Sequence, residues 1–385
     1  MRKLLVLSAH IPDPRIIKRL NSLNKFFDES HLLYWERDFG NGFSFPKIEG
    51  VISESISTTS NPSLVKRIFE NRSLREKTVN KILTYGPDVI YISGVELLWA
   101  IKKVPFKRKP IIILEIADLP ANTHISKLGF FGKFVEKILI NVVKEVPDYY
   151  VITSPGFYHG YYERYGFDKN KFFVFENVPP KDIFKTFEIN PEKIMDKEKL
   201  VIGYIGAVAY YSSLRTLFES CKNIQNVEIV VAGKGPDSEK VEREAKKYRN
   251  VKVLGKYIYE KDISRLYSMV DVVYSLYNTD NYNVKLALPN KLYESIVCGK
   301  PIIVARGTYL EEYVKKLGVG FSVPYNDVES LRELINNILN HRDQLCQISE
   351  RCIKIREDYF YENTEAKFLE WLDRIVCSYL DVEKE

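Results

Sequence analysis

Two charged residues three positions apart, Lys291 and Glu294, carry the strongest chemical signal in the sequence. They follow Pro289, which suits the first turn of a helix because its missing amide donor is not needed there. The free amides of such a helix start, together with the ammonium of Lys291, would bind a phosphate. Glu294 would lie on the same side one turn later and accept hydrogen bonds from the vicinal hydroxyls of a ribose. The alternative is an ordinary helix with a Lys–Glu surface pair, which this pattern alone would favour.

Two glycine turns precede this segment, each at the end of an apolar strand. The first strand runs into Gly206, and the second runs into Gly233, Lys234 and Gly235. Glycine allows the backbone to approach a phosphate or a sugar closely. One such turn is at home in any connection from a strand to a helix. Two of them ahead of the Lys291 segment strengthen the case for a nucleotide site in the second half of the chain.

The elements that would position these residues alternate regularly, strand after helix. Short β-branched apolar runs predict strands at 3–8, 31–35, 88–93, 110–116, 148–153 and 172–175, and again at 200–205, 227–232, 251–254, 270–276, 301–304 and 320–323. Longer patterns of helical periodicity lie between them, for example at 13–27, 64–83, 214–222, 239–248 and 327–339. This alternation predicts an α/β fold with parallel sheets covered by helices on both faces.

The pattern restarts once, which divides the chain into two doubly wound, Rossmann-like domains. The stretch 178–199 has two adjacent prolines, a run of charges and little periodicity, so it is typical of a linker. We expect domains at 1–182 and 183–360, with a last amphipathic helix, about 361–385, that packs back on the first domain. Ligands of open α/β sheets bind beyond the carboxyl ends of the strands. The two domains would therefore face a central cleft and bring two substrates together.

The composition is that of a globular protein, with 45% hydrophobic and 28% charged residues in a chain of 385. Its five cysteines form neither a CxxC pair nor a Cys/His cluster, which favours a reduced, intracellular protein. The first apolar run is too short for a signal peptide, and no stretch has the length of a membrane span. Residues 1–190 hold 28 basic and 21 acidic side chains. This basic half would suit an acidic lipid or a phosphorylated substrate, or it is a solvated surface.

The second half resembles the donor domain of the family-four glycosyltransferases, which have the GT-B fold and retain the anomeric configuration of the sugar. The matching segments are Gly203-Tyr204-Ile205-Gly206, Val231-Ala232-Gly233-Lys234-Gly235-Pro236, Val270-Asp271-Val272, and Pro289-Asn290-Lys291-Leu292-Tyr293-Glu294 with Gly299-Lys300-Pro301. The first half is similar through Asp13-Pro14-Arg15-Ile16, Pro87-Asp88-Val89-Ile90-Tyr91, Ser154 and Glu176-Asn177-Val178-Pro179. The resemblance covers nearly the full chain, and its most specific motifs lie in 200–305.

The resemblance implies that the second domain binds a nucleotide-diphosphate sugar, UDP- or GDP-linked, as the donor substrate. The expected donor residues are Gly206, Gly233, Lys234, Gly235, Tyr257, Pro289, Asn290, Lys291 and Glu294. Glu294 would hold the ribose, the helix start at 289–291 would meet the diphosphate, and 256–258 would flank the base. The acceptor would attack from the face that the nucleotide leaves, and the departing phosphate would help to take its proton. No protein nucleophile, cofactor or metal is expected.

The resemblance also implies a glycan or lipid-linked acceptor, in the synthesis of cell-surface polysaccharides or glycoconjugates. Polar residues at strand ends of the first domain are the acceptor-side candidates: His10, Asp13 and Arg15. Asp118 and His124 are the catalytic candidates, with Asp118 preferred for orienting an acceptor hydroxyl. The alternatives are that Asp118 caps a helix or turn and that His124 is an ordinary loop residue.

The segment 130–144 predicts a basic amphipathic helix. Phe131, Phe134, Val135, Ile138 and Val142 follow helical spacing, and Lys133, Lys137 and Lys144 lie on the other side. Such a helix suits an anionic membrane surface, which would place a cytoplasmic protein at the inner face of the membrane. The alternative, which the pattern slightly favours, is a helix packed on the sheet with its lysines in water.

Two departures from the family pattern keep other functions open. Leu286 stands where the family often has a glutamate, and no basic residue follows Gly206 before Arg215. A non-catalytic nucleotide-sugar or glycan-binding homologue is therefore one alternative. A sugar-nucleotide epimerase is another, although the sequence shows no dense set of carboxylates for it. Nucleic-acid binding is not expected, because the charge is not part of a recognised module.

Overall fold

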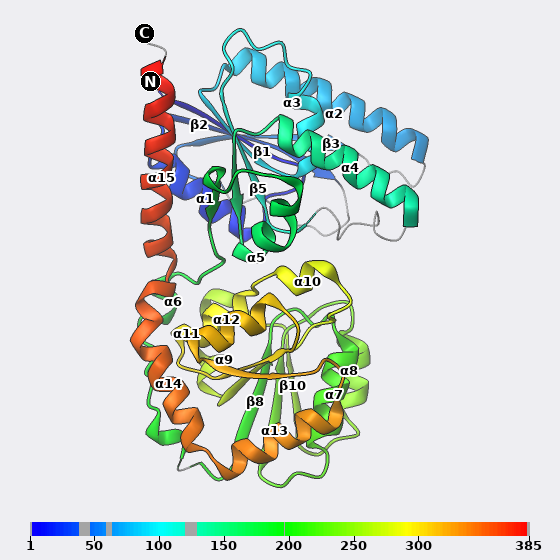
Figure 1. The fold of residues 1–385 in the computed structure, drawn as a ribbon, viewed down its shortest axis with the longest axis vertical. Coiled ribbons are helices and arrows are strands. Elements are labelled where there is room, and N and C mark those ends of the chain that lie inside the picture. The colour runs from blue at the N-terminus through cyan, green and yellow to red at the C-terminus, as the bar shows by residue number, and fades with distance from the viewer. Residues whose placement is uncertain (1, 38–46, 59–63, 120–128, 196, 383–385) are drawn as a thin grey trace. The chain divides into compact units, whose positions relative to one another are not determined.

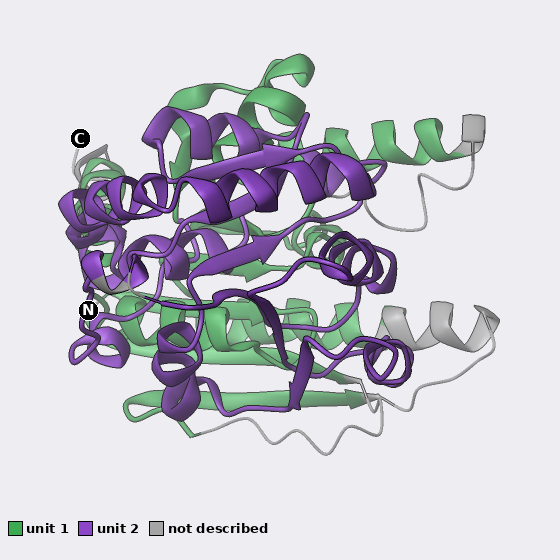
Figure 2. Ribbon diagram, turned by 90° about the horizontal axis from the view of Figure 1, so that it is seen from below, with its two compact units in different colours: residues 1–175, 365–385 green, residues 176–364 purple. Residues whose placement is uncertain are grey.

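The computed structural model describes residues 2–37, 47–58, 64–119, 129–195 and 197–382. They form two compact units, each with its own parallel sheet (Figures 1 and 2). Unit 1 comprises Met1–Phe175 and Glu365–Glu385, and unit 2 comprises Glu176–Thr364. The predicted α/β fold with two parallel sheets is confirmed.

Unit 1 contains a seven-stranded sheet in the order β3-β2-β1-β4-β5-β6-β7, and every pair is parallel. The strands are β1 (Lys3–Ser8), β2 (Glu29–Arg37), β3 (Val51–Thr58), β4 (Val89–Ser93), β5 (Ile111–Ile116), β6 (Tyr149–Ile152) and β7 (Phe172–Val174). β1, β4 and β5 are almost wholly buried, which explains why they are mainly apolar in the sequence, with Glu115 of β5 as the charged exception.

The helices of unit 1 are α1 (Pro14–Asn24), α2 (Leu64–Tyr85), α3 (Leu98–Ile101), α4 (Gly129–Glu145), α5 (Pro155–Phe157) and α15 (Tyr361–Val382). Asp13 caps α1 by accepting a hydrogen bond from the Ile16 amide at 2.9 Å, and Pro14 fills the first helical position. α15 begins in unit 2 and continues in unit 1, where Phe368 and Trp371 pack against Phe173. These aromatic contacts join the end of the chain to the β7 edge of the first sheet.

Unit 2 contains a six-stranded parallel sheet in the order β10-β9-β8-β11-β12-β13. The strands are β8 (Leu200–Ile205), β9 (Val227–Ala232), β10 (Val251–Gly255), β11 (Val272–Ser275), β12 (Ile302–Ala305) and β13 (Gly320–Val323). β8 and β11 are neighbours although two strands separate them in the sequence. The strand order therefore reverses between them, and such a reversal opens a crevice at the carboxyl ends of the two strands.

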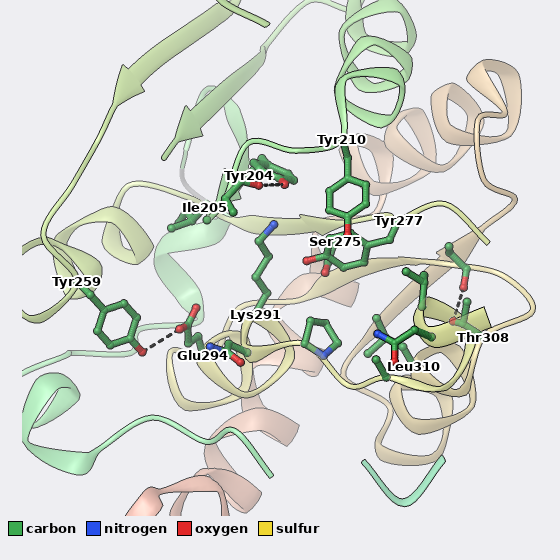
Figure 3. Close-up of a pocket in the computed structure, with 18 of the residues that line it drawn as sticks. Tyr204, Ile205, Tyr210, Tyr259, Ser275, Tyr277, Lys291, Glu294, Thr308 and Leu310 are labelled. Carbon is green, nitrogen blue, oxygen red and sulfur yellow. Dashed lines mark hydrogen bonds between the residues drawn. The ribbon is translucent and has the colours of Figure 1, made fainter. Parts of the chain in front are cut away.

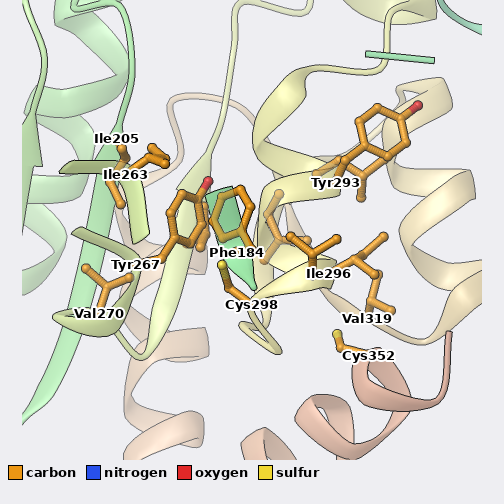
Figure 4. Packing of buried hydrophobic residues seen from close by; sticks show 14 of the residues in the cluster. Phe184, Ile205, Ile263, Tyr267, Val270, Tyr293, Ile296, Cys298, Val319 and Cys352 are labelled. Carbon is orange, nitrogen blue, oxygen red and sulfur yellow. The ribbon is translucent and has the colours of Figure 1, made fainter. Parts of the chain in front are cut away.

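The helices of unit 2 cover both faces of its sheet (Figure 1). They are α6 (Lys181–Phe184), α7 (Tyr211–Cys221), α8 (Ser238–Ala245), α9 (Tyr259–Ser268), α10 (Tyr282–Leu286), α11 (Asn290–Val297), α12 (Tyr309–Leu317), α13 (Val328–Asn340) and α14 (Asp343–Ile355). One apolar cluster packs α9, α11 and α12 on the sheet, with Tyr267 and Ile296 at its centre (Figure 4). A second cluster packs α7, α8 and α13 on the opposite face.

Two elements differ from the sequence prediction. β3 is not predicted because it is an edge strand that lacks an apolar run; among its residues whose burial is described, 51–57, only Val51 and Ile56 are buried. The stretch expected to be a linker, 178–199, belongs to unit 2 and contains α6, whose Phe184 is fully buried against Tyr267 of α9. The cysteines are all free.

Candidate functional site

A pocket of about 460 Å³ lies in unit 2, at the carboxyl ends of β8, β11 and β12 (Figure 3). This volume is in the range of small-molecule sites. The strand ends contribute Gly206, Ser275 and Ala305, and the start of α11 contributes Lys291 and Glu294. The pocket thus occupies the crevice that the strand reversal between β8 and β11 predicts.

The start of α11 brings the two charged residues together. Pro289 is the N-cap, with φ −79° and ψ 155°, and Asn290 is the first helical residue. Pro289, Asn290, Lys291 and Glu294 all line the pocket. The first-turn amides of a helix have no partner within the helix, so this end offers donors and a positive partial charge.

Lys291 lies in the middle of the pocket and points toward Tyr204 (Figure 3). Its Nζ is 3.4 Å from the centroid of the Tyr204 ring and 5.3 Å from that of Tyr277, within cation–π range. Burial lowers the pKa of Lys291 to about 7, although the nearby Glu294 carboxylate favours the charged form. An incoming anion would restore the charge of this ammonium, which makes Lys291 an anion-binding group.

Glu294 is buried and held by two tyrosines. Tyr259 donates a hydrogen bond to its Oε1 and Tyr267 donates one to its Oε2, both at 2.8 Å. Burial raises the pKa of both tyrosines, so both hydroxyls keep their protons. An ionised carboxylate only accepts hydrogen bonds, so Glu294 is an acceptor group in the pocket wall.

The glycine turns shape the pocket to different extents. Gly206 has φ +138° and lies so close to the Lys291 side chain that a Cβ would be 3.0 Å from its Cε. Gly233 has the same φ, and its Cβ would lie 1.8 Å from the carbonyl oxygen of Gly206. A Cβ on Gly235 would lie 2.5 Å from the Val208 carbonyl oxygen. Gly233 and Gly235 thus support the Gly206 loop from behind, whereas Gly206 lines the pocket itself.

Lys234 is exposed and does not belong to the pocket lining. Its place between two glycines predicts a donor-binding role, which this exposed position does not support. The structure instead brings the lysine of α11 to the centre of the pocket.

Much of the pocket wall is aromatic, and of these rings only Tyr257 is predicted from the sequence. Tyr204, Tyr210, Tyr259 and Tyr277 also line it. Tyr210 and Tyr277 pack edge to face, with ring centroids 4.9 Å apart. Tyr210 lies in the loop after Gly206, which contains no basic residue. The aromatic residues of that loop are the sequence feature that indicates an aromatic wall.

Two acceptor-side candidates of unit 1, Asp13 and Arg15, belong to a charge cluster around the buried Glu115. The Glu115 carboxylate is within 3.3 Å of the Nε of Arg19 and 3.5 Å of the Nε of Arg15, and it accepts a hydrogen bond from Tyr91. Nη2 of Arg15 also lies 3.1 Å from the Asp13 carboxylate. Burial would lower the pKa of Arg15, but Glu115 and Asp13 raise it above its ordinary value. Arg15 is therefore a fixed positive charge beside the start of α1.

His10 and Asp118 follow two different strands of unit 1. His10 follows β1 and is exposed, and its carbonyl oxygen accepts a hydrogen bond from Ser8 at 2.7 Å. Asp118 follows β5 and is also exposed. His124 lies outside the described residues.

The helix expected at 130–144 is α4, and its two halves differ. Val142 is buried toward the C-terminal end. Phe134 is 57% exposed and Ile138 is 38% exposed, and Lys133 and Lys137 beside them are exposed too. Lys144 donates a hydrogen bond to the Tyr165 carbonyl at 3.0 Å. The N-terminal half of α4 thus presents both apolar and basic side chains, and none of the helices described is long and apolar enough to cross a membrane.

Comparison with known proteins relates the chain to sugar-transferring enzymes. A model of the family "Glycosyl transferases group 1" matches residues 185–355, nearly the whole of unit 2. Comparison with curated protein sequences finds no significant match.

Solved structures share the fold across both units. Sucrose-phosphate synthase from Thermosynechococcus elongatus superposes with a TM-score of 0.73 at 14% identity, covering 98% of this chain and 100% of that one. HepE of Anabaena, in complex with UDP and glucose, has a TM-score of 0.69 at 14% identity, covering 97% and 100%. The lipopolysaccharide outer core galactosyltransferase WaaB has a TM-score of 0.67 at 14% identity, covering 97% and 99%. The GT-B fold is confirmed, and the matched domain and this fold support a glycosyltransferase, as the sequence predicts.

Proposed function

We propose that this glycosyltransferase moves a sugar from a nucleotide-diphosphate sugar, retaining its anomeric configuration, to a glycan or lipid-linked acceptor. The observation that carries the proposal is the pairing of Lys291 with Glu294 at the start of α11. An anion-binding lysine and a buried carboxylate, one turn apart in one pocket, match the diphosphate and the ribose of such a donor. The group 1 domain at residues 185–355 agrees with this placement.

Glu294 is the proposed ribose ligand. Its two oxygens are each fixed by one tyrosine hydroxyl at 2.8 Å. A carboxylate has two acceptor oxygens side by side, so Glu294 suits a vicinal diol. Tyr257, which also lines the pocket, would flank the base. The donor class is UDP- or GDP-sugar, and the UDP in the HepE complex makes UDP the first to test.

Lys291 and the first-turn amides of α11 are the proposed diphosphate ligands. Negative charge develops on the leaving diphosphate as the glycosidic bond breaks, and donors already in place stabilise it without reorganisation. The Nζ of Lys291 lies over the Tyr204 ring, 3.4 Å from its centroid. We therefore expect the diphosphate to attract this ammonium from the ring face. In this scheme the leaving phosphate takes the acceptor's proton, and the protein supplies no nucleophile.

Unit 1 is the proposed acceptor domain. Arg15, fixed between Glu115 and Asp13, is a charged group suited to an anionic or hydroxyl-rich acceptor. We propose that Asp118 orients the acceptor hydroxyl and that His10, Asp13 and His124 belong to the same side. WaaB is named as a galactosyltransferase of the lipopolysaccharide outer core. For this chain we propose a role in the synthesis of a cell-surface polysaccharide or glycoconjugate.

A peripheral contact with an anionic membrane from the cytoplasmic side is part of the proposal. Exposed Phe134 and Ile138 lie one turn apart on α4, and exposed Lys133 and Lys137 flank them. Apolar side chains that enter the interface, next to lysines that meet lipid phosphates, are the features of interfacial helices. Such a contact would bring the enzyme to a lipid-linked acceptor.

Two other activities predict different results with donor alone. An epimerase would need acid and base groups converging on the sugar, but Glu294 is the single carboxylate among the described pocket residues, and two tyrosines engage it. A non-catalytic homologue would bind the nucleotide and leave it unchanged. Incubation with UDP- or GDP-sugar therefore separates interconversion, binding without turnover, and slow hydrolysis typical of a transferase.

Calorimetric titration with UDP and GDP, on the wild type and on Glu294→Ala, tests the donor site. Glu176→Gln is a matched control, because Glu176 also accepts hydrogen bonds from two tyrosines, Tyr293 and Tyr313, at 3.0 and 3.1 Å, yet is not a pocket residue. We expect one nucleotide to bind the wild type and the Glu176 variant alike and to bind Glu294→Ala at least tenfold more weakly. Equal affinity for all three proteins would overturn the proposed site.

A further inference from the structure

We propose that the donor's sugar occupies the end of the pocket around Leu310 and that this end selects a 6-deoxyhexose over a hexose. The inference deepens the proposed function and depends on it. It concerns six lining residues, which we call the Leu310 end: Asn283, Val284, Ala287, Ala305, Thr308 and Leu310.

The order of groups along the pocket places the sugar at this end. Figure 3 shows Tyr259 and Glu294 on one side of Lys291, and Thr308 and Leu310 on the other. A nucleotide sugar is linear, with ribose, diphosphate and sugar in succession. When Glu294 holds the ribose and Lys291 the diphosphate, a donor bound in an extended conformation has its sugar on the side of Leu310.

The Leu310 end is one continuous surface made by two short helices and a strand end. α10, which carries Asn283 and Val284, packs against α12, which starts at Tyr309. Thr308 caps α12 and donates a hydrogen bond to the Ala305 carbonyl oxygen at 2.8 Å. Leu310 is only 4% exposed, so its position is set by the core.

This surface has little capacity to pair with sugar hydroxyls. Four of its six side chains are aliphatic, from Val284, Ala287, Ala305 and Leu310. The Thr308 hydroxyl donates its hydrogen bond to the Ala305 carbonyl oxygen and accepts one from the Glu311 amide at 3.1 Å. No charged side chain belongs to this end among the described lining residues, so Asn283 provides most of its side-chain polarity.

The chemistry of the surface therefore favours a sugar with an apolar substituent. A buried hydroxyl without a partner costs free energy, whereas a methyl group gains from contact with aliphatic side chains. A 6-deoxyhexose carries a methyl group where a hexose carries the CH₂OH of carbon 6. The edge-to-face pair of Tyr210 and Tyr277, nearby in the pocket, offers ring surface to the C–H groups of the sugar.

Matched pairs of donors test this selectivity. UDP-glucose against UDP-6-deoxyglucose, and GDP-mannose against GDP-6-deoxymannose, differ only at carbon 6. Calorimetric titration of the wild-type chain should give a lower Kd for the 6-deoxy member, by about 10- to 100-fold, the range of aliphatic pockets that meet an added hydroxyl. An equal or lower Kd for the hexose in both pairs would overturn the inference.

Two variants of Val284 assign the effect to the Leu310 end. Val284→Thr keeps the shape of the side chain and adds a hydroxyl, so the preference should fall to a few-fold. Val284→Ala removes volume without polarity and should leave the preference in the same direction. The preference unchanged in Val284→Thr would overturn the placement of the sugar. Titration with free UDP or GDP separates the two proposals. If a nucleotide binds and needs Glu294, but the donors show no 6-deoxy selectivity, only the inference is rejected. If neither nucleotide binds, the proposed function is rejected as well.

Discussion

Tyr267 donates a hydrogen bond to Oε2 of Glu294 at 2.8 Å from within the apolar core of unit 2. The tyrosine is fully buried on α9, whereas the carboxylate faces the pocket from α11. A side chain that no ligand reaches therefore sets the orientation of the proposed ribose ligand. Tyr259, in the first turn of α9, donates a hydrogen bond to the other oxygen, Oε1.

Tyr267→Phe should weaken discrimination between ribose and deoxyribose. The variant removes the hydrogen bond that holds Oε2 of Glu294 and leaves the one from Tyr259 to Oε1. A hydrogen bond to a charged group contributes about 1.5–3 kcal/mol. We expect UDP to bind roughly 10-fold more weakly and 2′-deoxy-UDP to change much less, so the ratio of their Kd values should shrink. Calorimetric titration of both nucleotides measures that ratio.

Tyr313→Phe is the control for this substitution. It also removes a tyrosine hydroxyl bonded to a glutamate, Glu176, at 3.1 Å, but outside the pocket. A purely structural effect would lower thermal stability in both variants and leave both ratios at the wild-type value. That result for Tyr267→Phe would remove its positioning role.

Lys291→Met should stabilise the ligand-free protein, and the gain should depend on pH. The folded-state pKa of Lys291, about 7, lies below the ordinary value of 10.5. Below pH 7 both states are protonated and the cost of the buried charge is fully present. Between pH 7 and 10.5 the unfolded state binds more protons, so the wild type gains stability as pH rises. The difference in Tm between variant and wild type should therefore be largest at pH 6 and shrink toward pH 9. A constant difference would contradict the buried charge.

Donor affinity should fall as pH rises above 7. The pKa of Lys291 near 7 means that the free protein loses the ammonium in this range, whereas the diphosphate of UDP-glucose keeps its charge. Binding would then require proton uptake, and the Kd should rise by up to about tenfold per pH unit between pH 7 and 8.5. Calorimetry in two buffers of different ionisation enthalpy would reveal the proton. Lys291→Arg should bind with a flat pH profile, because arginine stays charged.

Most of the fold follows from the sequence because parallel strands are buried on both faces. β1, β4 and β8 are continuous apolar runs, and their prediction needs no tertiary information. The edge strand β3 escapes prediction since, among its residues 51–57, only Val51 and Ile56 are buried. β3 pairs with β2 through eight residue pairs, and the sequence pattern does not show this pairing.

The candidate site divides in the same way. Lys291 and Glu294 are predictable because both lie on one helix start with a proline signal. Tyr259 and Tyr267 are not, since they reach Glu294 from a helix 35 and 27 positions away. Lys234 is the reverse case: its place between two glycines resembles a phosphate loop, but its side chain is exposed outside the pocket lining.

Gly233→Ala should be strongly destabilising, and Lys234→Ala should be neutral for both stability and UDP binding. A Cβ on Gly233 would lie 1.8 Å from the Gly206 carbonyl oxygen, so the Gly206 loop would have to move away from Lys291. Gly255→Ala is a control for a positive φ without a steric clash: its φ is +74°, against +138° for Gly233, and nothing lies within 4 Å of its Cβ. That variant carries the backbone strain alone, about 1 kcal/mol. Thermal unfolding should therefore show a much larger loss for Gly233→Ala than for Gly255→Ala. Equal losses of thermal stability would mean that the close contact between Gly233 and the Gly206 carbonyl oxygen does not determine the conformation of the Gly206 loop.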